Sequence, residues 1–236
     1  MDPLLRQLLE TAARPYGEAG RFARHLAKGK LRHDPVYFSL LRRGWLPDQG
    51  SLVDLGCGQG LLLSLLKAAK EQHAAGRWPR DWPAPPTRLA LRGVDSHADR
   101  VRLARRALGS GAQVDLCDLG DFDLRPCSAI ALLDVLLYLG ETQQERMIEK
   151  AAAALEPGGL LLLREADADA GFAFQATKCS AWFDAAMRGR FGQQLRCRSA
   201  AHWSDALARR GFAVDAEPMS RGTPFANVLF VARKVV

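Results

Sequence analysis

The stretch Val53-Asp54-Leu55-Gly56-Cys57-Gly58-Gln59-Gly60 decides the fold, because the end of an apolar strand runs into three glycines at alternate positions. Glycines in such a turn let the backbone bend sharply and approach a ligand with no Cβ in the way. A dinucleotide-binding turn needs the spacing G-x-G-x-x-G, but Leu61 stands three residues after Gly58. A phosphate-binding P-loop needs a Gly-Lys-Ser/Thr ending, which this stretch lacks. The spacing therefore argues against pyrophosphate as the ligand.

Strand and helix patterns alternate outward from this stretch. A buried helix follows the glycines, and the continuous apolar run 129–133 is typical of a parallel strand covered on both faces. Strands are expected at residues 52–55, 89–94, 112–116, 129–133, 160–163, 212–216 and 227–232. This alternation predicts an α/β fold, a Rossmann-like, doubly wound and mainly parallel sheet of seven strands. A ligand is expected beyond the carboxyl ends of the strands, where strand order reverses.

Extra helices are expected before this unit. Residues 1–50 form an N-terminal helical cap in this prediction. Apolar spacing predicts helix over residues 2–28, broken in two by Pro15 and Gly17. A further helix is expected to begin after Asp34, with that side chain as its N-cap and proline at the first helical position.

Two insertions are expected within the remaining domain, residues 51–236. Residues 71–87 are rich in tryptophan and proline and predict an insertion loop. Residues 166–200 form a long excursion after the fifth strand and are expected to act as a substrate lid. The segment Thr142-Gln143-Gln144-Glu145 has the pattern of a capping box at a helix start, and Pro157-Gly158-Gly159 is expected to turn the chain into the fifth strand.

The glycine stretch also resembles a known family. The pattern E/D-x-G-x-G-x-G after the first strand is the nucleotide motif of class I S-adenosylmethionine-dependent methyltransferases. The residues that match it are Asp54, Gly56, Gly58 and Gly60. The turn Leu155-Glu156-Pro157-Gly158-Gly159 is similar to the turn that often precedes the family's fifth strand. The resemblance covers residues 51–165 well, and it implies S-adenosylmethionine as cofactor and S-adenosylhomocysteine as product.

Acidic residues follow the later strands in the order of this family. Asp95 ends the second strand, where the family's carboxylate accepts hydrogen bonds from both ribose hydroxyls, a role that suits a group with acceptors only. Asp118 follows the third strand, and the resemblance places it against the adenine amino group with Leu119 beside the ring. Asp134 and Val135 end the fourth strand and resemble the position beside the methionine moiety and the transferable methyl.

The helical cap is expected to contribute to the same site. Leading helices close over the cofactor in similar enzymes, and Lys30 or Arg32 would pair with the methionine carboxylate or with an acidic acceptor. The alternative is a basic helix end that complements the helix dipole. The expected cofactor-binding set is Asp54, Gly56, Cys57, Gly58, Gly60, Asp95, Ser96, Asp118, Leu119, Asp134, Val135, Lys30 and Arg32.

The family's reaction is a direct displacement in which a nucleophile of the acceptor attacks the sulfonium methyl. A general base is needed only when the acceptor must lose a proton. Imidazole titrates near neutral pH, so His33 and His202 are candidates, and Tyr138 is a third because it comes directly after the fourth strand. Surface or core packing is the alternative role of each histidine.

The acceptor is expected to be small. No Asn/Asp-Pro-Pro-Tyr/Phe motif, often used to methylate amino nitrogens, follows the fourth strand, which shifts weight to an oxygen acceptor. An apolar lid would suit an aromatic or polyketide-like metabolite, and its side chains would be Phe172, Phe174, Trp182, Phe183 and Met187. Residues 221–227 resemble bacterial secondary-metabolite methyltransferases. Two alternatives remain: an RNA methyltransferase, and a non-catalytic cofactor-binding or partner protein on the same fold.

Composition narrows the partners and the compartment. The net charge of +7 and pI near 9.5 favour anionic partners. The basic residues are not clustered with aromatics, so nucleic acid is not expected, whereas an acidic acyl carrier protein that presents the acceptor would use this surface. Five scattered cysteines without a C-x-x-C pair predict no metal site and a reducing cytoplasm. No membrane span is expected, and no pattern indicates an oligomeric state.

Overall fold

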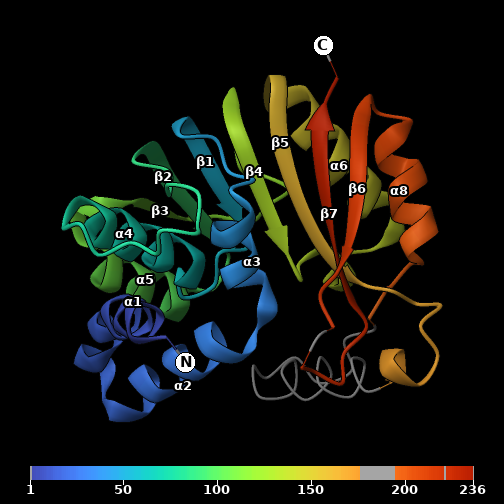
Figure 1. The fold of residues 1–236 in the computed structure, drawn as a ribbon. Coiled ribbons are helices and arrows are strands. Elements are labelled where there is room, and N and C mark those ends of the chain that lie inside the picture. The colour runs from blue at the N-terminus through green and yellow to red at the C-terminus, as the bar shows by residue number, and fades with distance from the viewer. Residues whose placement is uncertain (1, 176–194, 221, 236) are drawn as a thin grey trace. The chain divides into compact units, whose positions relative to one another are not determined.

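The computed structural model describes residues 2–175, 195–220 and 222–235 (Figure 1). The strands are β1 (Gln49–Leu55), β2 (Arg88–Asp95), β3 (Gln113–Leu116), β4 (Cys127–Leu133), β5 (Leu155–Ala166), β6 (Phe212–Pro218) and β7 (Asn227–Lys234). The helices are α1 (Pro3–Ala13), α2 (Arg21–His33), α3 (Pro35–Arg43), α4 (Leu61–Ala74), α5 (Ala98–Leu108), α6 (Glu141–Ala154) and α8 (Ala200–Ala208). Short 3-10 helices are η1 (Arg14–Ala19), η2 (Gly109–Gly111) and η3 (Leu136–Tyr138).

The sheet confirms the expected fold class. Its strand order is β3-β2-β1-β4-β5-β7-β6, so the order runs down the chain to β1 and then up it from β4. The glycine turn follows β1, the strand at which this order reverses, as the sequence predicts. The chain divides into two compact units, residues 1–122 with 127–129 and residues 123–126 with 130–236.

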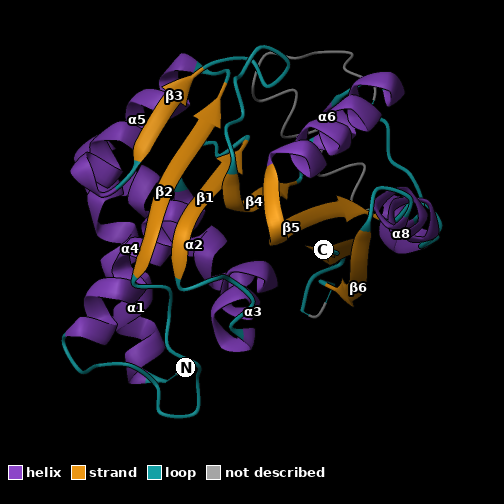
Figure 2. Cartoon of the chain, turned by 90° about the horizontal axis from the view of Figure 1, so that it is seen from above, coloured by secondary structure: helices purple, strands orange, loops and turns teal. Residues whose placement is uncertain are grey.

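The first unit is a three-stranded parallel layer with helices packed on it. β1 pairs with β2 and β2 with β3, in a register that sets Asp54 beside Gly93 and Gly93 beside Val114. Helices α4 and α5 pack against these strands, and α1 packs in turn on α4 (Figure 2). This stacking explains why nearly every residue of α4 from Leu61 to Ala69 is buried.

The N-terminal cap is helical, with boundaries slightly different from those expected. Asp2 caps α1 by accepting from the backbone N–H of Leu4 at 2.7 Å, and Asp34 caps α3 by accepting from Val36 at 3.2 Å. The break predicted near residue 15 is the 3-10 helix η1, which ends at Ala19 and is followed by Gly20 with φ 112°. The second cap helix, α2, then continues to His33, five residues past the expected end.

The insertion loop is shorter than predicted. Helix α4 continues through Ala74 because Gln72 is buried there and its Nε2 donates to the carbonyl of Leu4, 2.9 Å away. The remaining loop packs through its aromatic rings. Trp82 meets Trp78 edge to face at 5.8 Å between centroids, and it meets Phe38 of α3 at 6.3 Å.

The second unit contains the antiparallel end of the sheet. β7 runs antiparallel to both β5 and β6, with Leu162 opposite Val231. Helix α8 packs against β6 and β7, and α6 packs against β5 (Figure 1). The aliphatic run Leu160–Leu163 is almost fully buried, as its composition predicts.

Two local predictions in this unit are wrong. Helix α6 begins at Glu141 and not at a cap on Thr142, since the side chain of Gln143 accepts from the backbone N–H of Gly140 at 3.0 Å. Glu145 instead pairs with the guanidinium groups of Arg198 and Arg210, which come before and after α8 in the chain. The expected turn at residues 157–159 is part of β5, which begins at Leu155 and admits φ 73° at Gly158.

Candidate functional site

The glycine turn is fixed to the end of β2. The backbone N–H groups of Gly56 and Cys57 both donate to the carbonyl of Val94, at 2.8 and 3.0 Å. Gly56, Gly58 and Gly60 have φ values of 79°, 57° and 76°, in the left-handed region that disfavours other residues. The alternating glycines therefore serve the backbone path, as the sequence predicts.

The second and third glycines of the turn have different surroundings. A Cβ at Gly60 would lie 2.9 Å from Leu108 Cδ1 and 3.2 Å from Ala104 Cβ, so this glycine allows α4 to pack on α5. A Cβ at Gly58 would meet no protein atom within 4 Å. The open space at Gly58 is what a ligand lying against the turn would require.

Asp95 links the turn to β2 through its carboxylate. Oδ2 accepts from the backbone N–H of Gly58 at 2.9 Å, and Oδ1 accepts from the backbone N–H of His97 at the same distance. The residue is 5% exposed. A carboxylate has about four lone-pair sites, so Asp95 keeps acceptor capacity for the hydroxyls of a ribose. The remaining acceptor sites of Asp95 thus fit the ribose hydroxyls of S-adenosylmethionine.

Asp54 is a buried acid beneath the same turn. Its pKa is raised to about 7 by burial and then by the nearby Asp95 carboxylate, against the positive charge of Lys30, which lowers it. The charge of Lys30 on α2 therefore reaches the cofactor turn. A second link is the hydroxyl of Tyr16, which donates to the carbonyl of Gln59 at 2.8 Å from η1. The N-terminal cap is in direct contact with the glycine turn.

The remaining expected cofactor residues of this unit are more open. Asp118 is exposed, and its Oδ1 accepts from the N–H of Gly120 at 2.8 Å, so the carboxylate shapes the turn after β3. Ser96 is exposed and Leu119 is half-buried, while Arg32 is exposed near the end of α2. Their roles in binding adenine, ribose or a carboxylate stay predictions.

Asp134 stands out in the second unit because of its backbone. Its φ is 59°, and it is the one non-glycine residue with positive φ among residues 2–175, 195–220 and 222–235. Its carboxylate forms a two-point ion pair with the guanidinium of Arg164, with Nε 2.9 Å from Oδ1. Val135, the other residue predicted beside the methionine moiety, is half-buried and leads into η3.

Sequence reasoning missed Arg164 and Glu165. Arg164 has a side chain that is 3% exposed, and Glu165 is 1% exposed and accepts from backbone N–H groups of η3. Neither belongs to a recognised motif. Their one sequence signal is that two charges directly follow the apolar run Leu160–Leu163 of β5.

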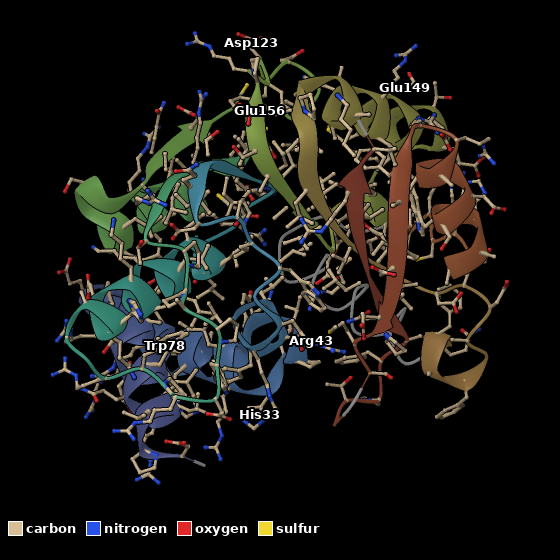
Figure 3. All side chains as sticks on the ribbon, turned by 45° about the horizontal axis from the view of Figure 1, so that its top comes forward. His33, Arg43, Trp78, Asp123, Glu149 and Glu156 are labelled. Atoms are coloured by element: carbon tan, nitrogen blue, oxygen red, sulfur yellow. The ribbon has the colours of Figure 1, made fainter. Side chains whose placement is uncertain are left out.

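The three candidate bases lie in different settings. Tyr138 ends η3 and is half-exposed. His33 is exposed at the end of α2 (Figure 3). His202 of α8 points its Nε2 at the guanidinium of Arg198 and lies 3.5 Å from Glu145 Oε1, so its ring is already part of an ion cluster.

The predicted lid lies partly outside the described residues. Trp182, Phe183 and Met187 are not described, whereas Phe172 is 89% exposed. Phe174 is half-exposed. Where the excursion leaves the sheet, the N–H of Ala168 donates to the carbonyl of Arg198 at 3.1 Å, which joins its two ends.

The described residues contain neither a membrane-spanning helix nor a cluster of metal-binding side chains. None of the helices in residues 2–175, 195–220 and 222–235 is both long and apolar enough to cross a membrane. Within those residues, no group of three or more histidine, cysteine, aspartate or glutamate side chains could hold a metal ion.

Comparison with known families decides the affiliation. A family model described as a methyltransferase domain matches residues 22–217, which include the glycine turn, Asp95 and Asp134. The chain belongs to this methyltransferase family. The family uses S-adenosylmethionine as methyl donor, so the methyltransferase has the cofactor that the glycine turn predicts.

Individual relatives resemble parts of the methyltransferase. A carboxy-S-adenosyl-L-methionine synthase of Chromohalobacter salexigens is 35% identical over 117 residues, covering 48% of this chain and 38% of that protein. The chain thus spans less than half the length of the curated relatives it matches.

Solved structures share the fold at low identity. An O-methyltransferase family protein of Burkholderia thailandensis is 16% identical with a TM-score of 0.64, covering 92% of this chain and 61% of that one. Magnesium protoporphyrin IX methyltransferase of Synechocystis, solved with bound S-adenosylhomocysteine, is 19% identical with a TM-score of 0.59, covering 94% and 91%.

Proposed function

We propose that this methyltransferase transfers the methyl group of S-adenosylmethionine to an oxygen of a small aromatic or polyketide-like metabolite. The observation that carries the cofactor part is the open space over Gly58 beside the buried carboxylate of Asp95. The acceptor part is supported by the missing amino-nitrogen motif after β4 and by the shared fold of an O-methyltransferase family protein.

The chain's own residues would bind and orient the methyl donor. Asp95 accepts from ribose hydroxyls, and Asp118 and Leu119 contact the adenine ring. Asp134 and Val135 lie beside the methionine moiety in this proposal. Lys30 is the better placed of the two cap cations for the methionine carboxylate, because its charge already acts on Asp54.

In this reaction the protein mainly aligns the acceptor oxygen with the methyl carbon and sulfur of the donor, and it need not form a covalent bond itself. The acceptor oxygen forms a bond to the methyl carbon while the carbon–sulfur bond breaks, and the acceptor's hydroxyl proton passes to a base or to water. Holding the reacting atoms in line is worth up to about 7–11 kcal/mol in favourable cases. Tyr138 is our first candidate for contact with the acceptor, because His202 is held in an ion cluster and His33 is exposed at the end of the cap.

Titration calorimetry tests the cofactor assignment. S-adenosylmethionine and S-adenosylhomocysteine should bind wild type, and both Asp95→Ala and Gly58→Val should bind at least tenfold more weakly. Loss of the ribose acceptor explains the first effect and a side chain in the open space the second. Unchanged affinity in both variants would refute the cofactor site.

The acceptor is tested with donor labelled at the methyl group. A panel of phenols and polyketide-like hydroxyaromatics, offered free and attached to an acidic acyl carrier protein, should yield a labelled product by mass spectrometry. Labelling of RNA alone would contradict the proposal, and binding of cofactor without any turnover would favour the non-catalytic reading. Tyr138→Phe, His33→Ala and His202→Ala then rank the candidate bases.

A second candidate function follows from the similarity of about half of the chain to a curated relative. The 35% identity to a carboxy-S-adenosyl-L-methionine synthase favours modification of the cofactor itself. In that case the product would be S-adenosylmethionine enlarged by a carboxyl group, and no separate acceptor would gain a methyl. Mass spectrometry of the cofactor pool after incubation with carboxylic acids distinguishes the two functions.

A further inference from the structure

The short segment after β4 is held by a buried acid from β5. The backbone N–H groups of Leu136 and Leu137 donate to Glu165 Oε1 and Oε2, at 2.7 and 3.2 Å. Glu165 is 1% exposed, and it is the last residue but one of β5. Because no side chain of its own caps η3, the carboxylate of Glu165 takes that role from another strand.

A buried amide holds the same segment by its carbonyl groups. Gln144 of α6 is fully buried, and its Nε2 donates to the carbonyls of Leu136 and Leu139, at 2.9 and 3.3 Å. The same atom donates to the carbonyl of Arg196 at 2.8 Å, and the N–H of Arg196 donates to the carbonyl of Leu137. The N–H groups of the segment are therefore bound by a side chain of β5, and its carbonyls by a side chain of α6.

The segment begins at the strained residue Asp134. Its φ of 59° is a conformation that persists in a non-glycine residue only where the surroundings fix it. Here they do: the N–H of Asp134 donates to the carbonyl of Arg164 at 2.9 Å, and its carboxylate pairs with the Arg164 guanidinium. The backbone after β4 is thus fixed at its start and along its length.

We propose that Glu165 is a positioning residue, whose carboxylate, together with the Gln144 amide, holds Asp134–Tyr138 in the conformation that receives the methionine end of the cofactor. This inference rests on the proposed function, which sets Asp134 and Val135 beside the methyl group. Glu165 touches neither cofactor nor acceptor in this role. It acts through the backbone that it binds.

The protonation state of Glu165 should change the strength of its hydrogen bonds to the backbone of the segment after β4. The pKa of Glu165 is raised to about 8 by burial and then by the Asp134 carboxylate, against the backbone N–H groups of Val135, Leu136 and Leu137, which lower it. The ionised carboxylate can accept from all three donors, whereas the acid must place its own hydrogen among them. Cofactor affinity should therefore rise with pH through this range, by at most about tenfold per pH unit for one linked proton.

Titration calorimetry with S-adenosylhomocysteine between about pH 6.5 and about pH 9.5 tests the inference. Glu145→Gln is the matched control, because Glu145 is a partly buried carboxylate of the same unit whose partners are Arg198 and Arg210. Wild type and this control should bind more tightly as pH rises. Glu165→Gln should lose the part of this increase that is centred at about pH 8, and it should keep the pH dependence that Asp54 and the ligand's own amino group contribute.

Two outcomes separate this inference from the proposed function. Identical pH profiles for wild type and Glu165→Gln would overturn the positioning role, whereas failure of wild type to bind at any pH would overturn the cofactor site. If Glu165→Gln does not fold, Gln144→Met provides the test. It should bind several-fold more weakly than wild type with the pH profile retained, and an unchanged affinity would count against the inference.

Discussion

At the scale of single residues, the ion pair of Asp134 and Arg164 should contribute to the free energy of unfolding. Asp134→Ala removes the carboxylate that pairs with the Arg164 guanidinium, whose side chain is 3% exposed. It also leaves an alanine at φ 59°, a backbone conformation that is unfavourable for alanine. We expect a loss of about 2–4 kcal/mol in the free energy of unfolding, measured with urea. Asp134→Asn should lose less, because asparagine tolerates positive φ and keeps one acceptor. Equal losses would contradict this account.

Asp54 predicts how stability depends on pH. Its pKa is raised to about 7 in the folded chain, so between about pH 4 and pH 7 the folded chain binds more protons than the unfolded one. Stability contributed by this group is therefore present at low pH and lost as pH rises through about 7. Asp54→Asn should show a smaller loss between about pH 5 and pH 8 in urea titrations, and parallel curves would contradict the prediction.

Some site residues can be predicted from the sequence because they belong to local motifs, and others cannot because their contacts are long-range. Asp95 could be found because it ends the second strand, where the resembling family has an acidic residue; in the structure it accepts a hydrogen bond from Gly58, and its role toward the ribose stays a prediction. Arg164 and Glu165 could not be found, because their partners lie directly after β4 and in η3, about 30 positions away in the chain. Nothing local in the sequence records such a long-range contact.

At the scale of elements, the glycine turn offers a matched pair of substitutions. Gly60→Ala sets a Cβ against Leu108 and Ala104 and should destabilise the chain by about 1–3 kcal/mol in urea unfolding. Gly58→Ala meets no protein atom and should lose only the backbone cost of about 1–2 kcal/mol, but it should weaken S-adenosylhomocysteine binding. The reverse pattern in calorimetry and unfolding would show that the two glycines have been assigned the wrong roles.

The strands were all predictable, whereas several element boundaries were not. All seven expected strands are present in the structure. The signal is clearest for β4, because a strand that is buried on both faces leaves a continuous apolar run. The start of α6 was misjudged because Glu145 pairs with Arg198 and Arg210 rather than with its own helix end. The end of α4 was missed because the contact that extends it joins Gln72 to Leu4.

At the scale of the whole molecule, cofactor binding should raise thermal stability. S-adenosylhomocysteine at a hundred times its Kd should add about 2.7 kcal/mol. For a chain of this size, that corresponds to an increase of about 5–10 °C in melting temperature. Asp95→Ala at the same ligand concentration should show a much smaller shift in differential scanning fluorimetry. An equal shift would place the ligand elsewhere on the molecule.

The bond between Ala168 and Arg198 has a consequence for engineering and for evolution. It closes the base of the excursion after β5, and the carboxylate of Asp167 adds a second tie by accepting from the N–H of Ala200 at 3.0 Å. A segment with joined ends can be exchanged as a cassette, because its replacement leaves the strands on either side in place. Under the proposed function, the acceptor range would change on replacement of residues 169–195 while the donor turn at Gly56–Gly60 stays constant. Arg196 would be kept, because its backbone binds Leu137 and Gln144, and chimeras joined after Ala168 and before Arg196 would test this.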